Sequence, residues 1–160
     1  MKVEEVLLAV PEGGQLILGQ SHFIKTVEDV YEALVTSMPG IKFGVAFCEA
    51  SGKALIRCDG SDEEATSTAR NFASLLGAGH CFVVVLAGAF PINVLNRIKN
   101  VEEIAGIYCA TSNPVTVIVA DTGKGRGILG IVDGVSPRGS ETESDKTERH
   151  EFLRKIGYKR

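Results

Sequence analysis

Hydrophobic positions along the chain fall into two patterns, short apolar runs and stripes at helical spacing. The runs predict strands at 3–10, 15–20, 43–48, 54–58, 81–87, 104–111, 115–120 and 128–132. The stripes predict helices that begin near residues 26, 61, 91 and 143. Strands outnumber helices and several are wholly apolar. We therefore expect an α/β fold in which helices cover both faces of a mixed sheet, a three-layer α/β/α arrangement in a single domain over residues 1–160.

Turn and capping residues mark the borders of these elements. Residues 11–14, Pro-Glu-Gly-Gly, predict a hairpin between the first two strands. Thr26 with Asp29 predicts a capping box at the first helix, and Pro91 is a favoured first helical residue. The last helix, 143–156, is expected to pack through three apolar side chains, Phe152, Leu153 and Ile156.

Composition narrows the classes of partner. The 160 residues suffice for one core, and the net charge of −3 comes from intermixed acidic and basic residues, so nucleic acid is not an expected partner. The acidic N-terminus does not have the form of a secretory signal. No apolar run approaches the roughly 18 residues of a membrane span, so we expect a cytoplasmic protein with no membrane association. The four cysteines form no C-x-x-C pair and are expected to be buried reduced thiols; no metal site is predicted.

A glycine-rich stretch, 121–134, resembles a phosphate-binding loop. It contains a G-x-G-x-x-G pattern at Gly125, Gly127 and Gly130, and Lys124 and Arg126 each lie between two glycines of the stretch. A P-loop or a Rossmann fingerprint would need a helix after the glycines, but a β-branched, strand-like run follows. A kinase glycine loop is a hairpin, but the chain has no H-R-D or D-F-G. We interpret the stretch as a structural hairpin whose two cations could still face a phosphate.

Three histidines are candidates for chemistry. His80 lies between the glycine stop of a helix and a buried strand, which is typical of a satisfied core histidine. His22 lies between a strand end and a helix start, where open α/β sheets bind ligands. His150 lies on the last helix, about 60° from Leu153, where a solvated surface histidine is the plainer interpretation.

Residues 89–96 place an aromatic ring and two carboxamides around a helix start. Phe90 could stack on a purine, and Asn93 could serve both the donor and the acceptor edge of adenine. Asn113 could do the same from the next strand end. The competing interpretation is ordinary capping and turn chemistry.

Five segments taken together, and in this order, resemble the adenosine-specific kinase family. They are 19–29 (GQSHFIKTVED), 43–50 (FGVAFCEA), 90–96 (FPINVLN), 109–114 (CATSNP) and 152–159 (FLRKIGYK). The resemblance implies an oligomeric protein that binds adenosine and AMP and transfers a phosphoryl group through a phosphorylated histidine. We assign that role to His150, beside the last segment, and hold His22 in reserve.

The binding and transfer chemistry that the resemblance implies needs further residues, and the sequence offers candidates for them. The expected adenosine-binding residues are Ser21, Phe90, Pro91, Asn93 and Asn113. The expected phosphate-binding cations are Lys25, Arg126 and Arg149, with the amides at two helix starts, and Glu49 or Asp133 would orient the imidazole.

No cofactor beyond the adenosine nucleotide is firmly implied, and a divalent metal is left open. The phosphate of AMP is a monoester with a poor leaving group, so a stable phosphohistidine is easier to explain than a fast catalytic cycle. The alternative is a non-catalytic adenosine-nucleotide sensor or binding module, favoured by the absence of any familiar kinase motif.

Overall fold

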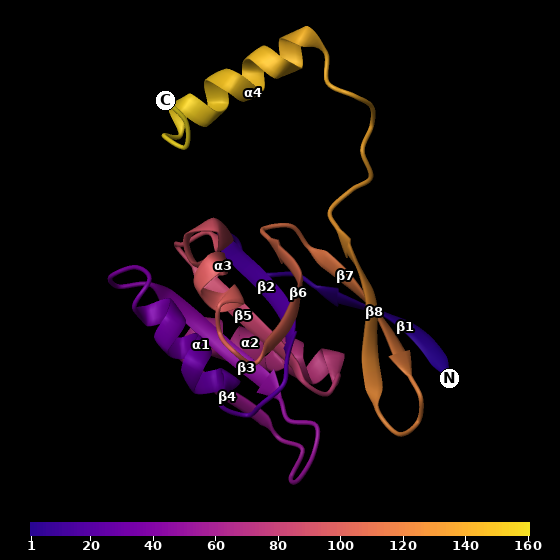
Figure 1. The fold of residues 1–160 in the computed structure, drawn as a ribbon. Helices are drawn as coiled ribbons and strands as arrows, with labels where there is room; N and C mark the ends of the chain where they lie inside the picture. The colour runs from indigo at the N-terminus through magenta and orange to yellow at the C-terminus, as the bar shows by residue number, and fades with distance from the viewer.

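The computed structural model describes all 160 residues as two antiparallel sheets and four helices (Figure 1). In chain order the elements are β1 (Lys2–Leu8), β2 (Gly14–Ser21), α1 (Thr26–Val35), β3 (Lys42–Cys48), β4 (Ile56–Gly60), α2 (Glu63–Leu76), β5 (Cys81–Ala87), α3 (Pro91–Lys99), β6 (Ile104–Thr111), β7 (Val115–Asp121), β8 (Arg126–Asp133) and α4 (Glu143–Lys155). The predicted α/β class is confirmed. The strands pair antiparallel in two sheets, where a single mixed sheet was expected.

The larger sheet has the order β4-β3-β5-β2-β6, with the apolar strand β5 at its centre. On one face, α1 and α3 complete a core that includes Phe43, Phe82 and Ile98. On the other face, α2 and the smaller sheet complete a second core that includes Leu16 and Val117. The molecule is thus layered as predicted, except that the third layer combines a helix with a second sheet.

The hairpin predicted across residues 11–14 is wrong. A turn does form there, since the Gly14 amide donates to the Pro11 carbonyl at 2.8 Å, but β1 and β2 do not pair. β1 pairs with β7 in the smaller sheet, whereas β2 lies between β5 and β6. The reason is burial: Leu16, Ile17 and Leu18 are fully buried on both faces of the larger sheet, which only an interior position provides.

The glycine-rich hairpin is confirmed, because β7 and β8 pair antiparallel around residues 122–125. Gly123, with φ of 77°, supplies the left-handed turn residue. The three glycines of the G-x-G-x-x-G pattern face open space, so close packing is not their role.

The capping box predicted for α1 does not form, and the N-cap is one residue earlier than predicted. Lys25 is the N-cap and makes no side-chain cap. Thr26 is fully buried, and its hydroxyl donates to the Phe23 carbonyl and pairs with Ser21 Oγ. Asp29 accepts instead from Lys25 Nζ at 2.8 Å. Burial against β2 therefore overrides the local capping pattern.

Residues 134–160, which we call the arm, leave the smaller sheet after β8 and place α4 over one end of the larger sheet (Figure 1). A capping box between Thr142 and Asp145 begins α4. None of its residues is buried, and Leu153 is only half-buried, so the expected packing of this helix is looser than the sequence suggested. No helix in the protein is both long enough and apolar enough to cross a membrane.

Candidate functional site

The predicted site residues divide between opposite ends of the larger sheet. β2 begins with Gly14 opposite Ala87, next to the segment that leads into α3, and finishes with Gln20 opposite Cys81, next to His80. Eight residues at about 3.3 Å each separate these ends by about 25 Å. We call the end beneath α4 the arm end, and the end that holds His22 and His80 the histidine end.

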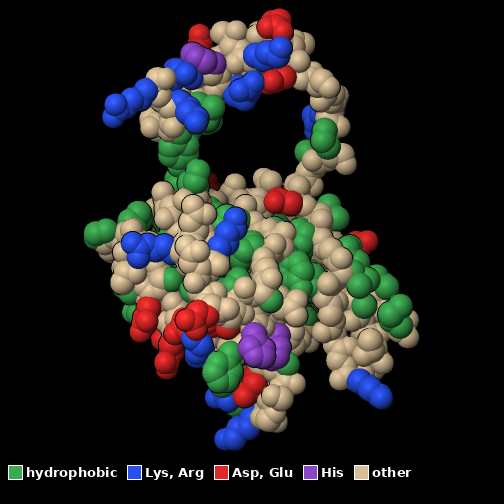
Figure 2. Space-filling model, viewed as in Figure 1, with side chains coloured by type: hydrophobic (Ala, Val, Ile, Leu, Met, Phe, Trp, Pro, Cys, Tyr) green, Lys and Arg blue, Asp and Glu red, His purple; other side chains and the backbone are tan.

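At the arm end, α4 and the body enclose a pocket of about 680 Å³. Its lining residues are Phe90, Pro91, Ile92, Ala110, Thr111, Ser112, Phe152, Ile156 and Tyr158. In Figure 2, hydrophobic side chains bridge the arm and the body at one place, beside a wide opening under the rest of the arm. Three aromatic rings and three hydroxyl-bearing side chains around a concave apolar space suit a flat heteroaromatic ring.

The five predicted adenosine-binding residues do not come together. Phe90 and Pro91 line the arm-end pocket. Asn93 instead accepts from the Phe90 amide at 2.9 Å, and Asn113 donates to Asp133 at 3.0 Å, which is the capping and turn chemistry considered as the alternative. Ser21 is buried at the histidine end, hydrogen-bonded to Thr26.

His150 and Arg149 lie on exposed α4, less than one turn before Phe152, the first residue of the helix that lines the pocket. His150 and Phe152 are two positions apart and so about 160° apart around the helix, which points the imidazole away from the pocket that Phe152 lines. Arg149 pairs with Glu141 through contacts of 2.8 and 3.1 Å. This hydrogen-bonded pairing lowers the pKa of Glu141 and raises that of Arg149.

The histidine end contains a pair of neighbouring imidazoles whose proximity no sequence motif predicts. The ring centroids of His22 and His80 lie 6.3 Å apart in an edge-to-face arrangement, and His80 also stacks on Phe47 at 5.9 Å. Figure 2 shows histidines in two places, this pair on the body and one on the arm. His80 is half-buried and has a left-handed φ of 63°, so it is only partly the core histidine predicted.

Lys25, predicted to bind phosphate, is already surrounded by carboxylates. Its Nζ lies 2.8 Å from Asp29, 3.5 Å from Glu103 and 3.8 Å from Glu102. The hydrogen bond from Lys25 to Asp29 raises the pKa of the lysine, although desolvation opposes it. An incoming phosphate would have to displace these anions.

Glu103 is the residue of this end that sequence reasoning missed. Its side chain is only 3% exposed, and neither carboxylate oxygen has a hydrogen-bond partner. A glutamate in the turn before β6 has no sequence signal for burial. Its position follows from the pairing of β6 with β2, which also joins the Glu103 carbonyl to the His22 amide at 2.8 Å.

Glu49 and Arg126 are held by polar contacts to other residues, and neither side chain has a hydrogen bond to a histidine. Glu49 accepts from the Leu55 amide at 3.0 Å and from Arg57 at 3.1 Å, and the Leu55 amide lowers its pKa most. Arg126 donates to the Leu75 carbonyl at 3.0 Å and to Glu4 at 2.9 Å. Both line a cavity of about 440 Å³ beside Cys48.

Asp133, the other residue proposed to orient an imidazole, accepts from Thr111 and Asn113 at the arm end. It therefore secures the loop between β6 and β7. No group of three or more histidine, cysteine or carboxylate side chains is arranged to hold a metal ion.

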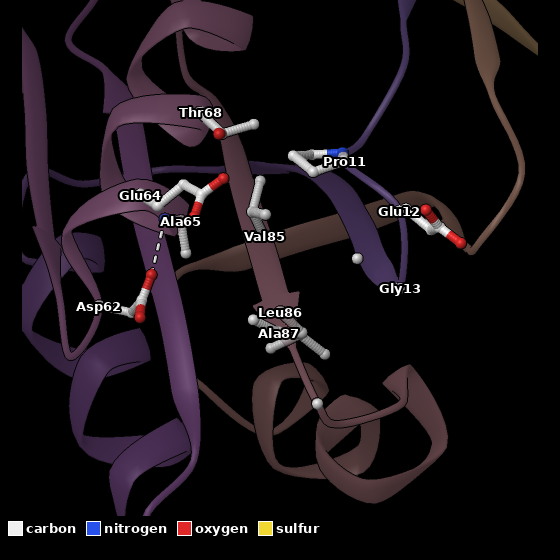
Figure 3. Close-up of a pocket in the computed structure, with 12 residues that line it drawn as sticks. Pro11, Glu12, Gly13, Asp62, Glu64, Ala65, Thr68, Val85, Leu86 and Ala87 are labelled. Atoms are coloured by element: carbon white, nitrogen blue, oxygen red, sulfur yellow. Dashed lines mark hydrogen bonds between the residues drawn. The ribbon is translucent and has the colours of Figure 1, made fainter.

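A smaller pocket of about 310 Å³ lies between the 11–14 loop, the start of α2 and the end of β5 (Figure 3). Three carboxylates line it, those of Glu12, Asp62 and Glu64, and Asp62 is occupied in capping α2 through the Ala65 amide at 3.0 Å. None of the predicted site residues is present, and the negative charge disfavours a phosphate.

Comparison with known proteins agrees with the resemblance found in the sequence. A family model described as "Adenosine specific kinase" matches residues 6–159. The chain is also similar to the crystal structure of PH1918 protein from Pyrococcus horikoshii OT3, with 47% identity and a TM-score of 0.95 over 99% of this chain and 98% of that one. No curated protein matches the chain.

Proposed function

The chain belongs to the adenosine-specific kinase family, and we propose that it binds adenosine or AMP at the arm end and takes part in phosphoryl transfer through a phosphohistidine. One observation supports this most. Three of the five family segments, 90–96, 109–114 and 152–159, are distant in sequence and meet around a single pocket. The convergence of three such segments on one pocket is more simply explained by a common ligand than by the needs of folding alone.

The pocket suits the base of the nucleotide. Adenine would stack among the faces of Phe90, Phe152 and Tyr158, and such stacking is worth about 1–3 kcal/mol per base. The hydroxyls of Thr111 and Ser112 would donate to or accept from the edge of the base. The phosphate would then approach the N-terminus of α3. Pro91 has no N–H, and the Phe90 and Asn93 amides already donate within the turn at 2.9 Å each, so the Ile92 amide is the first-turn donor left for an anion.

Distance favours His150 over His22 as the phosphoryl acceptor. His150 is on the arm beside the pocket, whereas His22 lies about 25 Å away along the sheet. A neutral imidazole is a competent nucleophile near pH 7. Because the His150 ring points away from the pocket of its own chain, transfer requires that the arm rolls about its axis, or that the imidazole serves a second copy in an oligomer.

The assignment is tested by following transfer of labelled phosphate from AMP to the protein in His150→Ala and His22→Ala variants. We expect His150→Ala to abolish acid-labile labelling while adenosine affinity, measured by calorimetry, stays within about twofold, because the ring does not line the pocket. Labelling that persists in His150→Ala and disappears in His22→Ala would move the reaction to the histidine end.

A mixing experiment separates the two routes to His150. Phe90→Ala impairs the pocket and His150→Ala removes the acceptor, so each variant alone should label poorly. Recovery of labelling in the mixture would support transfer between copies, and failure to recover would support movement of the arm within one chain.

The second candidate is a non-catalytic adenosine-nucleotide sensor. It is favoured by the charges: Lys25, Arg126 and Arg149 are each paired with carboxylates, so none is free to align a phosphate. Product that stops at one equivalent per chain would support the sensor, whereas many equivalents would support an enzyme. Absence of any heat of adenosine binding would contradict both candidates.

A further inference from the structure

Two cysteines face each other on the neighbouring strands β3 and β5, at the histidine end of the larger sheet. β3 and β5 pair with Phe47 opposite Phe82, and one further step along the ladder brings Cys48 opposite Cys81. Their sulfur atoms lie 3.5 Å apart, and both residues are free thiols buried in the core under α2.

The backbone geometry suits a bond between these sulfurs. Opposed residues of antiparallel strands have Cα atoms about 4.5–5.5 Å apart, within the range of about 4.4–6.8 Å that disulfides span. The sulfurs need only move from 3.5 Å to about 2.05 Å, which side-chain rotation can supply.

One of the two thiols has a route to solvent. Cys48 lines the open cavity of about 440 Å³ at the histidine end, together with Gly79, Glu49 and Arg126. Gly79 forms part of the wall, and a Cβ there would lie 2.9 Å from Ala50, so the absence of a side chain keeps this wall thin. Cys81 is absent from the lining and lies behind Cys48.

We propose that Cys48 and Cys81 are a dithiol site that a small peroxide, entering through this cavity, oxidises to a disulfide. Cys48 is the attacking thiol and Cys81 the resolving one. The Cys81 thiol donates a hydrogen bond to Cys48 Sγ, which in turn donates to the Ala73 carbonyl. The hydrogen bond between the two thiols lowers the pKa of Cys48, which burial opposes, and raises the pKa of Cys81, which burial raises further.

The reaction balances in two steps. The Cys48 thiolate attacks one oxygen of hydrogen peroxide, the O–O bond breaks, and a sulfenic acid forms with loss of hydroxide. Cys81 then attacks the Cys48 sulfur, the S–O bond breaks, and the oxygen leaves as water with the thiol proton. Two thiols and one peroxide thus give one disulfide and two waters.

The disulfide would act on the histidine pair through the backbone. The His80 amide donates to the Cys48 carbonyl at 2.7 Å, and His80 is the residue before Cys81. Drawing the two sulfurs together shifts the turn that holds His80 in its left-handed conformation, and with it the contact between His80 and His22. His150, on the arm, would not be affected.

The test is peroxide treatment of the folded, full-length protein, followed by blocking of free thiols in denaturant, tryptic digestion and mass spectrometry. Lys53, Arg57, Arg70 and Arg97 place each of the four cysteines in a different tryptic peptide. We expect a peptide pair joined through Cys48 and Cys81, lighter by two hydrogens and cleaved by dithiothreitol, at least tenfold more abundant than any other pair. The NMR signals of His22 and His80 should move and those of His150 should not.

Matched serine variants complete the test. Cys58→Ser and Cys109→Ser should keep the cross-link, whereas Cys48→Ser and Cys81→Ser should each abolish it, with circular dichroism confirming that every variant is folded. The proposal is overturned if Cys48 remains fully blockable at peroxide concentrations that already oxidise the partly exposed Cys58. It is also overturned if the cross-link forms only after unfolding.

Discussion

The two ends of the larger sheet are built on opposite principles. The arm end is an apolar hollow closed by α4, none of whose residues is buried. The histidine end is formed by strand ends packed into the body, and it holds a buried carboxylate, two imidazoles and two facing thiols. The first arrangement can adapt to a ligand because little fixes α4 in place. The second is suited to chemistry because buried ionisable groups respond strongly to small changes.

Three phenylalanines offer a direct test of this difference. Phe90 and Phe152 at the arm end are 56% and 57% exposed, and Phe23 at the histidine end is 53% exposed, so all three can be replaced at similar cost to the fold. We expect Phe90→Ala and Phe152→Ala each to weaken adenosine binding about 10- to 100-fold, since each removes one stacking face.

Phe23→Ala is the matched control, and its adenosine affinity should stay within about twofold of the parent in calorimetry. If Phe23→Ala instead weakens binding most, the nucleoside lies at the histidine end and the comparison is reversed.

Lys25→Met probes the charge balance of the histidine end. The substitution leaves the buried Glu103 carboxylate without its only nearby cation, so we expect the melting temperature to fall by several degrees. Adding Glu103→Gln to Lys25→Met should restore most of the lost melting temperature, because the buried charge is then removed. The coupling is measured by a double-mutant cycle of melting temperatures. Equal and additive losses would mean that Lys25 acts through Asp29 alone. Adenosine affinity should not change.

Acid should loosen the arm before the body. Asp145 accepts from the Thr142 amide and hydroxyl, and Glu141 accepts from Arg149; these contacts lower the pKa of both carboxyl groups. Because the folded-state pKa of each group is lowered, each group stabilises the fold fully at pH values above its ordinary pKa, 3.8 for Asp145 and 4.5 for Glu141. That stabilisation is lost as the pH falls through the lower, folded-state pKa. The amide-exchange protection factors of the first turn of α4, taken relative to intrinsic rates at each pH, should therefore fall below about pH 4.5, while the strands stay protected.

Asp145→Asn should reproduce part of this fraying at pH 7, because it removes the cap carboxylate. An α4 whose exchange does not respond to acid or to this substitution would be held by contacts other than its cap. The effect of Asp145→Asn on adenosine affinity should be small, since the pocket contacts lie at the far end of the helix.

Several elements were predictable because their signals are local. Asp62 caps the start of α2 through its side chain, and Pro91 begins α3 because its φ angle is already helical. The glycine-rich hairpin joins two strands that are adjacent in sequence. The errors arose where a local signal competed with burial. The 11–14 turn forms without its hairpin, and Thr26 turns its hydroxyl inward to Ser21.

The sequence by itself determined the elements, the α/β class and the family, because periodicity, turn residues and long motifs are all written along the chain. Only the tertiary structure decided which motifs meet. β1 pairs with a strand more than a hundred residues away, and β2 separates Ser21 from Phe90 by its full length. Strand partners are chosen by the burial of whole faces, which no local pattern encodes. For the same reason Glu103, His80 and the facing cysteines were visible as residues but not as neighbours.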